Sequence, residues 1–132
     1  MMPPRVNRFT EVALRNRDRA EPVEIWKARN FIHEHSDEEL SLTKVAKFVN
    51  ISPNHLSDKF KEVTGVNFVD YIGRHRIEKA RELLQNLNLR ISEIAFAVGF
   101  QSLSQFNRVF RKLAGKSPTA YRAAKAKRRH RD

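Results

Sequence analysis

The chain has 132 residues, enough for one domain or for two small helical units that share a connection. Its 26 Lys and Arg outnumber its 15 Asp and Glu, and the net charge of +11 favours a polyanionic partner, with nucleic acid ahead of an acidic membrane surface. The absence of cysteine excludes disulfides, thiolate zinc sites and thiol nucleophiles.

Helix is the expected secondary structure throughout. The chain has only four Gly and five Pro, and alternating runs of β-branched residues are scarce. It also lacks a run of roughly 18 apolar residues, which a membrane span requires, and an apolar signal segment near Met1. We therefore predict an all-α, cytoplasmic protein that is not associated with a membrane.

The first 21 residues show no clear periodicity, and we interpret residues 1–21 as a tail or linker. The first predicted helix begins at Pro22, a residue suited to a first helical position, and runs to about His35. Its apolar residues recur at helical spacing and define one buried face: Ile25, Ala28, Phe31 and Ile32.

The rest of the chain contains one unit twice. Residues 46–51 match residues 95–100 at an offset of 49, and residues 56–71 match residues 106–121 at an offset of 50. The matched pairs include Ala46 with Ala95, Val49 with Val98, Leu56 with Phe106, Phe60 with Phe110, Gly65 with Gly115 and Tyr71 with Tyr121. Self-similarity at a fixed offset indicates one structural unit used twice.

Each unit has the pattern of a short helix, a tight turn and a longer helix. Asn50 and Gly99 occupy equivalent turn positions, and both residue types readily adopt a left-handed backbone. Ser52 and Ser102 are placed to cap the longer helices, which end at Gly65 and Gly115. The pattern predicts a helix-turn-helix subdomain at residues 22–66 and a second one at residues 88–122.

A long linker helix is predicted between the subdomains, at residues 67–87. The apolar face of this helix is formed by Ile77, Ala80, Leu83 and Leu84. Twenty helical residues, 67–86, would span roughly 30 Å, which is close to the roughly 34 Å between DNA half-sites one turn apart. Gly73 within this helix indicates either close packing or a bend, and close packing is the simpler interpretation.

The longer helices, at about 53–63 and 103–114, each carry an apolar stripe and an opposite polar stripe. The apolar stripes are Leu56, Phe60 and Val63 in the first helix and Phe106, Phe110 and Leu113 in the second. The polar stripes are Asn54, Ser57, Asp58 and Lys61 in the first and Ser104, Asn107, Arg108 and Arg111 in the second. We expect both apolar stripes to be buried and both polar stripes to be exposed.

These polar groups suit the base edges of a DNA major groove. Arg pairs with guanine, Asn with adenine, and a carboxylate accepts a hydrogen bond from the cytosine amino group. Lys61, Arg111 and Lys112 lie further along their helices and are better placed for phosphates. The alternative is that the two polar stripes are ordinary solvated helix faces without a partner. The occurrence of equivalent polar stripes after equivalent turns in both units argues against this alternative.

Asp58 leaves two interpretations open, because a carboxylate near phosphates is repelled by them. It would either read a cytosine or pair with Lys61 one turn further on. Its counterpart in the second unit is Arg108. Opposite charges at matched positions predict that the two units read different bases, so that one monomer recognises an asymmetric site.

The sequence resembles the DNA-binding domain of AraC/XylS-type bacterial transcription regulators from residue 23 to about residue 122. The motifs that carry the resemblance are LTKVAKFVNISPNHLSDKFKEVTG, RIEKARELL and ISEIAFAVGFQSLSQFNRVFRKLAGKSPTAYR. The resemblance implies about seven helices, two homeodomain-like helix-turn-helix subdomains joined by a linker helix, and binding to two adjacent major-groove segments near promoters.

The resemblance also implies a set of base-reading residues. They are Asn54, Ser57 and Asp58 in the first recognition helix, and Ser104, Gln105, Asn107 and Arg108 in the second. Gln105 enters this set by resemblance alone. The chain departs from many members by carrying Asp58 where a basic or larger polar side chain is frequent.

Double-stranded promoter DNA is therefore the predicted partner, and RNA polymerase is a second candidate partner. The predicted role is transcription regulation on the nucleoid, as an activator or a repressor. Family members commonly carry a separate effector-binding or dimerisation domain. The chain is then either a stand-alone regulator or the C-terminal piece of a longer protein, and the linker-like residues 1–21 favour the piece.

The remaining features point to no other chemistry. Residues 123–132 read as a disordered basic tail that attracts phosphates. His33 and His35 point roughly 200° apart on a helix, and His55 and His75 have no evident partner, so we assign no metal. No nucleophile-base motif, paired carboxylates or phosphate-binding Gly loop occurs, so we predict neither an enzyme nor a cofactor.

Two other binding classes are alternatives to duplex DNA recognition. An RNA-binding module would expose aromatic rings for stacking, whereas most Phe residues here fall on the predicted buried stripes. A protein adaptor would need an exposed apolar groove, and only Leu103 and residues 1–21 suggest one.

Overall fold

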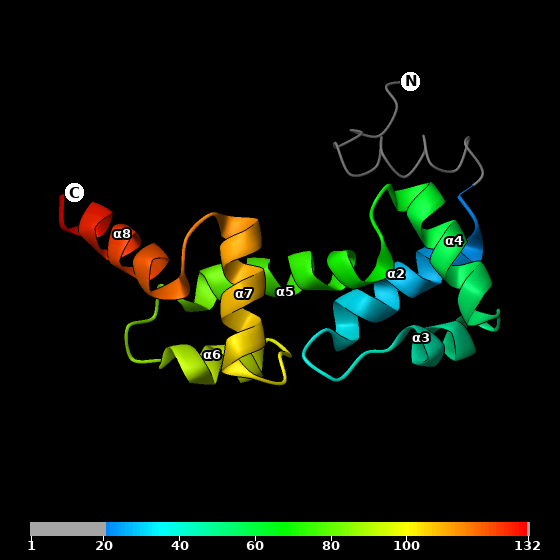
Figure 1. Ribbon diagram of the computed structural model, residues 1–132, viewed down its shortest axis with the longest axis horizontal. Coiled ribbons are helices and arrows are strands. Elements are labelled where there is room, and N and C mark those ends of the chain that lie inside the picture. Colours follow the sequence, from blue (N-terminus) through cyan, green and yellow to red (C-terminus); the bar gives the residue numbers. More distant parts are fainter. Residues whose placement is uncertain (1–20, 132) are drawn as a thin grey trace, which may run out of the picture.

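The computed structural model describes residues 21–131 and forms seven α-helices within them, without a strand (Figure 1). The helices are α2 (Val23–His35), α3 (Leu42–Val49), α4 (Pro53–Thr64), α5 (Phe68–Leu83), α6 (Ile91–Ala97), α7 (Leu103–Ala114) and α8 (Pro118–Arg131). The predicted all-α fold with two helix-turn-helix units is confirmed. The N-terminal segment that we interpret as a tail or linker lies outside the described residues, except for Glu21.

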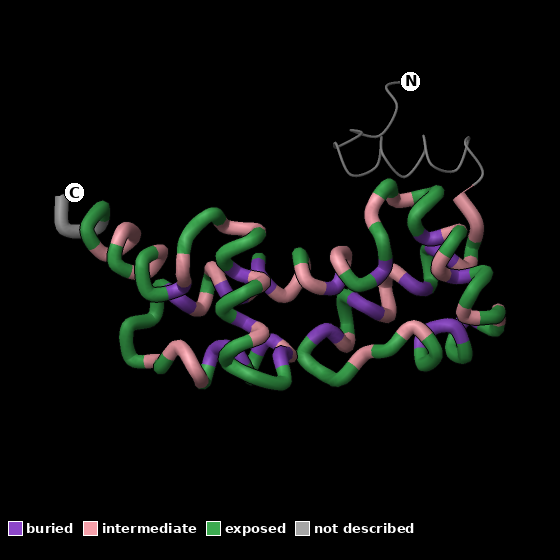
Figure 2. Tube along the Cα trace, in the orientation of Figure 1, coloured by how far each residue is buried: buried purple, intermediate pink, exposed green. Residues whose placement is uncertain are grey.

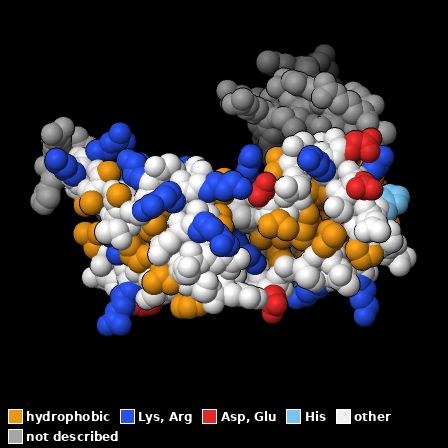
Figure 3. Space-filling view, viewed as in Figure 1, with side chains coloured by type: hydrophobic (Ala, Val, Ile, Leu, Met, Phe, Trp, Pro, Cys, Tyr) orange, Lys and Arg blue, Asp and Glu red, His pale blue; other side chains and the backbone are white. Residues whose placement is uncertain are grey.

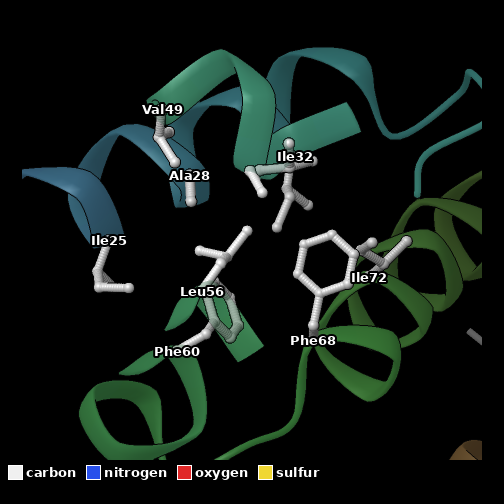
Figure 4. Close-up of a cluster of buried hydrophobic side chains, with 10 residues drawn as sticks. Ile25, Ala28, Ile32, Val49, Leu56, Phe60, Phe68 and Ile72 are labelled. Carbon is white, nitrogen blue, oxygen red and sulfur yellow. The ribbon is translucent and has the colours of Figure 1, made fainter. Parts of the chain in front are cut away.

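Two separate hydrophobic cores hold these helices together (Figure 2). The first gathers side chains from α2, α3, α4 and the N-terminal half of α5, and its members converge as Figure 4 shows: Ile25, Ala28, Ile32, Val45, Ala46, Val49, Leu56, Phe60, Phe68 and Ile72. The second gathers side chains from the C-terminal half of α5, the loop after it, α6, the turn after α6, and α7: Ile77, Ala80, Leu84, Ile94, Ala95, Val98, Phe100, Phe106 and Phe110.

Helix α5 therefore belongs to both cores. Phe68 and Ile72 lie in the first core, and Ile77 and Ala80 lie in the second. In Figure 1, α5 runs along the long axis of the molecule between the two units. It links the units and at the same time acts as the first helix of the second unit, as α2 does in the first.

The linker helix is shorter than predicted. It has 16 residues and ends at Leu83, so it spans about 24 Å rather than 30 Å. The amides of Leu84, Gln85 and Asn86 bond to carbonyls three or four residues back and turn the chain out of the helix. The apolar pattern of the sequence continues past the end of the helix, because Leu84 lies in the turn and its side chain still packs in the second core.

Gly73 lies in α5 between the two sets of core residues. A Cβ atom placed on it would come 3.6 Å from Cγ1 of Val109 in α7, which is an ordinary van der Waals contact. Helix α5 is continuous through this position. The structure therefore supports close packing of α7 on α5 and shows no break at Gly73.

Three further expectations are wrong in detail. Pro22 is the N-cap of α2 rather than its first helical residue. Val63 was expected on the buried stripe of α4, but 36% of it is exposed because it lies at the edge of that stripe near the end of the helix. The predicted disordered tail is also helical, since α8 continues to Arg131.

Composition and anchoring explain the helical tail. Four alanines in α8, at positions 120, 123, 124 and 126, favour helix more than any other residue type. Arg122 ties α8 to the end of α5, because its Nε donates to the carbonyl of Leu84 at 2.9 Å and a terminal nitrogen donates to the carbonyl of Asn86 at 3.2 Å. The basic residues that follow Tyr121 are thus held on a helix.

His75 has a partner, contrary to the sequence-based expectation. Its ring stacks on that of His33 with centroids 4.6 Å apart, and Nε2 of His33 shares a 2.8 Å hydrogen bond with the hydroxyl of Tyr71. Nε2 of His75 is buried without a hydrogen-bond partner. Burial lowers the pKa of both histidines, and Lys79 nearby adds to the shift. This pair joins α2 to α5 in its neutral form.

No helix among residues 21–131 is long and apolar enough to cross a bilayer. The same residues hold no group of three or more histidines and carboxylates that would suit a metal ion.

The histidine pair predicts a pH dependence of stability. The native pKa of His75 lies below the ordinary 6.5, so between these two values the unfolded chain binds more protons than the native one. The free energy of unfolding should be constant above about pH 7.5 and fall as the pH drops through 6.5, by at most about 1.4 kcal/mol per pH unit per histidine. His75→Phe should reduce this fall in urea titrations between about pH 7.5 and 5.5.

His55→Gln is the matched control, because His55 is exposed and its side chain forms no hydrogen bond, ion pair or ring contact with another described residue. It should leave the pH profile unchanged. Parallel profiles for the wild type and His75→Phe would contradict the role assigned to the pair.

Candidate nucleic-acid interface

The turns of the two units have the same hydrogen bonds. Asn50 adopts a left-handed conformation with a φ of 64°, and Gly99 has a φ of 112°. The amide of Ile51 donates to the carbonyl of Ala46 at 3.1 Å, and the equivalent amide of Phe100 donates to Ala95 at 3.0 Å. The predicted equivalence of the turns is confirmed, and each turn fixes how its longer helix leaves the short one.

Helices α4 and α7 also begin and end alike. The hydroxyls of Ser52 and Ser102 accept hydrogen bonds from the amides of the third residues of the helices, both at 3.1 Å. Each helix has 12 residues and ends at a left-handed glycine, Gly65 or Gly115. Both predicted caps are confirmed. In Figure 1 the two helices run in the same direction on either side of the centre of the molecule.

Most of the predicted DNA-contacting side chains lie exposed on these two helices. Ser57 and Gln105 are half-buried, and the exposed members are Asn54, Asp58, Lys61, Ser104, Asn107, Arg108, Arg111 and Lys112. Apart from Lys112, none of them forms a side-chain hydrogen bond or ion pair with another described residue. Their polar groups are therefore available to a partner.

Two members of the set lie on a different edge of α7 from the rest. Gln105 and Lys112 line a groove of about 330 Å³ between α7 and the first unit. Nζ of Lys112 lies 4.0 Å from a carboxylate oxygen of Asp70 in α5, which is a weak ion pair. The groove also exposes apolar side chains, including Val69, and Figure 3 shows such side chains gathered between α7 and α4.

The two candidate helices differ in charge. Helix α4 carries two lysines and two carboxylates and is neutral overall, whereas α7 carries two arginines, one lysine and no carboxylate. In Figure 3, Lys and Arg side chains gather over α7, while acidic side chains occur over α4. One of the two interpretations of Asp58, an ion pair with Lys61, is wrong. Among the described residues, the ion pair within α4 joins Lys59 and Glu62 at 3.7 Å, and the carboxylate of Asp58 has no ion-pair partner.

Sequence reasoning missed Arg76. This residue lies on α5 and donates from its side chain to the carbonyls of Ser36 and Glu38, both at 2.8 Å. Burial lowers the pKa of its guanidinium group. In the sequence, an arginine that bonds to distant carbonyls cannot be told from an arginine whose side chain is solvated, because both lie in a helix rich in charged residues. Only the structure reveals the contacts of Arg76.

These observations define a class of protein in which two helix-turn-helix units share one helix and each exposes a polar helix face. Comparison with known proteins agrees with this class. A family model described as a helix-turn-helix domain matches residues 45–124. The chain belongs to the AraC/XylS-type helix-turn-helix family of transcription regulators.

Individual relatives support this assignment. The HTH-type transcriptional regulator YijO of Escherichia coli K12 is 37% identical over 94 residues, which are 71% of this chain and 33% of that protein. The C-terminal domain of AraT, a response regulator from Geobacillus stearothermophilus, has a TM-score of 0.75 and 38% identity, covering 78% of this chain and 86% of the other. The DNA-binding domain of AdpA, solved with a target DNA, has a TM-score of 0.77 and 27% identity, covering 83% and 98%.

The chain spans about a third of the length of the curated relatives that it matches. The correspondence thus concerns one region of those proteins, namely their helix-turn-helix part.

The two turns should respond differently to substitution. Asn50→Gly should change the free energy of unfolding by no more than about 0.5 kcal/mol, and Asn50→Ala should cost about 1 to 2 kcal/mol because of its left-handed backbone. Gly99→Ala should cost more than Asn50→Ala, since a Cβ there would lie 2.2 Å from the carbonyl oxygen of Ser36. Urea unfolding of the variants measures these values. Equal costs for the two alanine variants would contradict the close approach at Gly99.

Proposed function

We propose that this chain is a sequence-specific reader of double-stranded promoter DNA that inserts α4 and α7 into successive major grooves and thereby regulates transcription. The observation that carries the proposal is the pair of equivalent turns, each presenting a capped 12-residue helix with an unpartnered polar face. Recognition helices of this class contact base edges through residues near their N-termini. Asn54 and Ser104 occupy that place in α4 and α7.

The proposed division of labour follows from position along each helix. Asn54, Ser57 and Asp58 would read bases through α4, and Ser104, Gln105, Asn107 and Arg108 would do so through α7. Lys61, Arg111 and Lys112 lie nearer the C-terminal ends and would contact phosphates. Of these ten residues, Gln105 has the least direct access, because it lies at the edge of the groove.

The charge difference between α4 and α7 supports an asymmetric site. Helix α7, with three cations and no carboxylate, would supply most of the phosphate attraction. Helix α4 is neutral and would add discrimination more than affinity, with the free carboxylate of Asp58 accepting from a cytosine amino group. One monomer would thus cover two unequal boxes. The fold of AdpA, which was solved with a target DNA, is consistent with this mode.

The proposal has two further parts, which rest on the family and not on a contact within residues 21–131. RNA polymerase is the proposed second partner for activation on the nucleoid, and control by an effector would reside in a part outside residues 21–131. The basic helix α8, with Lys125, Lys127 and Arg128, would add sequence-independent attraction to the duplex.

Selection of bound sites from random duplex DNA tests the function directly. We expect one motif with two unequal boxes about one helical turn apart, or roughly 10 base pairs. Enrichment of unpaired RNA in a parallel selection, or no enrichment of any duplex sequence above background, would contradict the proposal.

Arg108 and Arg111 form a matched pair for testing base reading against phosphate contact. Arg108→Ala should cost about 1–3 kcal/mol on the selected site and relax the preference at one base position. Arg111→Ala should weaken binding to all sequences alike and reduce the slope of log affinity against log salt by about 1. Titrations on the selected site and on a scrambled duplex measure both. Uniform weakening by Arg108→Ala would make Arg108 a phosphate contact instead.

A further inference from the structure

Arg76 lies on α5 where the two cores meet. Ile72, the last core residue of the first unit on this helix, precedes it by four positions, and Ile77, the first of the second unit, follows it directly. The side chain is half-buried, and no carboxylate pairs with it in the part of the chain that the structure describes. Its charge is therefore held by the first and second units rather than by an acidic partner.

The first unit supplies two carbonyl groups to Arg76. Nε donates to the carbonyl of Ser36 at 2.8 Å, and a terminal nitrogen donates to the carbonyl of Glu38 at 2.8 Å. Ser36 is the C-cap of α2, so its carbonyl lies at the negative end of that helix dipole, and Glu38 lies in the turn directly after it. The fork of a guanidinium group binds both at once, which a single ammonium group does not.

The second unit meets the same guanidinium group. The central carbon of the Arg76 guanidinium lies 5.7 Å from the centroid of the Phe100 ring, within the range of a cation–π contact. Gly99 lies so close that a Cβ atom on it would be 2.7 Å from Nε of Arg76 and 2.2 Å from the carbonyl oxygen of Ser36. The turn of the second unit thus packs directly on the loop that follows α2.

Other contacts between the units are sparse. Within residues 21–131, α2, α3 and α4 pack on one another and α4 packs on α5, whereas α6 and α7 pack on each other and on α5, and α8 packs on α7. In contrast, α2, α3 and α4 do not pack extensively on α6, α7 or α8. A groove of about 330 Å³ separates them on one side, and Arg76, Gly99 and Phe100 are among its lining residues. The junction at Arg76 is therefore the main link between the units apart from α5 itself.

We propose that Arg76 is a positioning residue that fixes the angle between the two helix-turn-helix units and so sets the spacing of the two DNA boxes that they read. The proposal rests on the proposed function for its consequence, and on the contacts of Ser36, Glu38, Gly99 and Phe100 for its mechanism. Helix α5 fixes the distance along its axis. The Arg76 junction fixes the rotation of each unit about that axis.

The consequence is a strict spacing requirement. Moving one box by one base pair shifts it by about 3.4 Å and rotates it by about 35° around the duplex. A rigid pair of units would have to break contacts in one box to follow this change. A pair that can rotate about α5 would follow it at little cost.

The test begins without DNA, and the absence of cysteine makes the labelling specific. Lys47→Cys in α3 and Ala97→Cys in α6, both exposed, would carry spin labels outside the proposed DNA-binding faces. We expect a narrow distance distribution in the parent protein, and a distribution at least about twice as broad with Arg76→Gln or Arg76→Lys. Arg74→Gln removes the same charge from an exposed position two residues away and should leave the distribution narrow.

The second measurement uses duplexes with the two selected boxes set one base pair closer, at the selected spacing, and one base pair further apart. The parent protein and Arg74→Gln should lose at least about fivefold in affinity for each shift, the lower end of the cost of one mismatched pair. The Arg76 variants should lose less than about twofold in affinity for each shift of one base pair. Their affinity for a duplex that carries one box alone should lie within about threefold of the parent protein's affinity for the same duplex. Single-box binding shows that both units are still folded.

The outcomes separate the two claims. Unchanged distance distributions in both Arg76 variants, or an unchanged spacing requirement despite broader distributions, would overturn the role of Arg76. Failure to select any duplex site would count against the proposed function, and broad distributions in that case would still support the junction.

Discussion

Both hydrophobic cores depend on one helix. Phe68 and Ile72 are buried in the first core and Ile77 and Ala80 in the second, so α5 cannot leave either without exposing apolar surface. A fully buried side chain the size of Ile or Phe contributes about 1.5–3 kcal/mol, and each core takes such residues from α5. The separation of α4 from α7 along the axis of α5 follows from this sharing, because each unit takes core residues from its own half of α5.

This constraint explains why the two units can be alike in backbone and unlike in surface. The turns at Asn50 and Gly99, the caps at Ser52 and Ser102, and the glycines that end α4 and α7 are set by local hydrogen bonds. The outward faces take no part in those bonds, so their chemistry is free to differ. Asp58 and Arg108 occupy matched positions with opposite charges, and under the proposed function that difference would give each unit its own base preference.

Much of this arrangement could be predicted from the sequence because it is encoded locally. Left-handed turn residues, serine caps and apolar residues at helical spacing each act over fewer than ten residues. Apart from Val63 at the edge of the apolar stripe of α4, they were placed correctly in both units. The long-range contacts could not be predicted. Arg76 bonds to carbonyls 38 and 40 residues away, and His75 stacks on His33 across two helices. Backbone carbonyl partners leave no mark in a sequence.

The errors at helix ends have the same origin. Leu84 continues the apolar pattern of α5 but fills the second core from a turn, so periodicity alone extended the helix too far. The basic residues after Tyr121 suggested disorder, yet Arg122 anchors α8 to the carbonyls that end α5. In both places a tertiary contact at the end of α5 decided the local structure.

Under the proposed function, the sharing of α5 between two cores means that a single molecule should present both α4 and α7 to the same side of one duplex. Hydroxyl-radical footprinting of a one-to-one complex on a duplex carrying its selected site examines this most directly. We predict two protected segments on one face of the DNA, with centres about 10 base pairs apart. A single protected segment, or a second segment that appears only when another molecule binds, would contradict it.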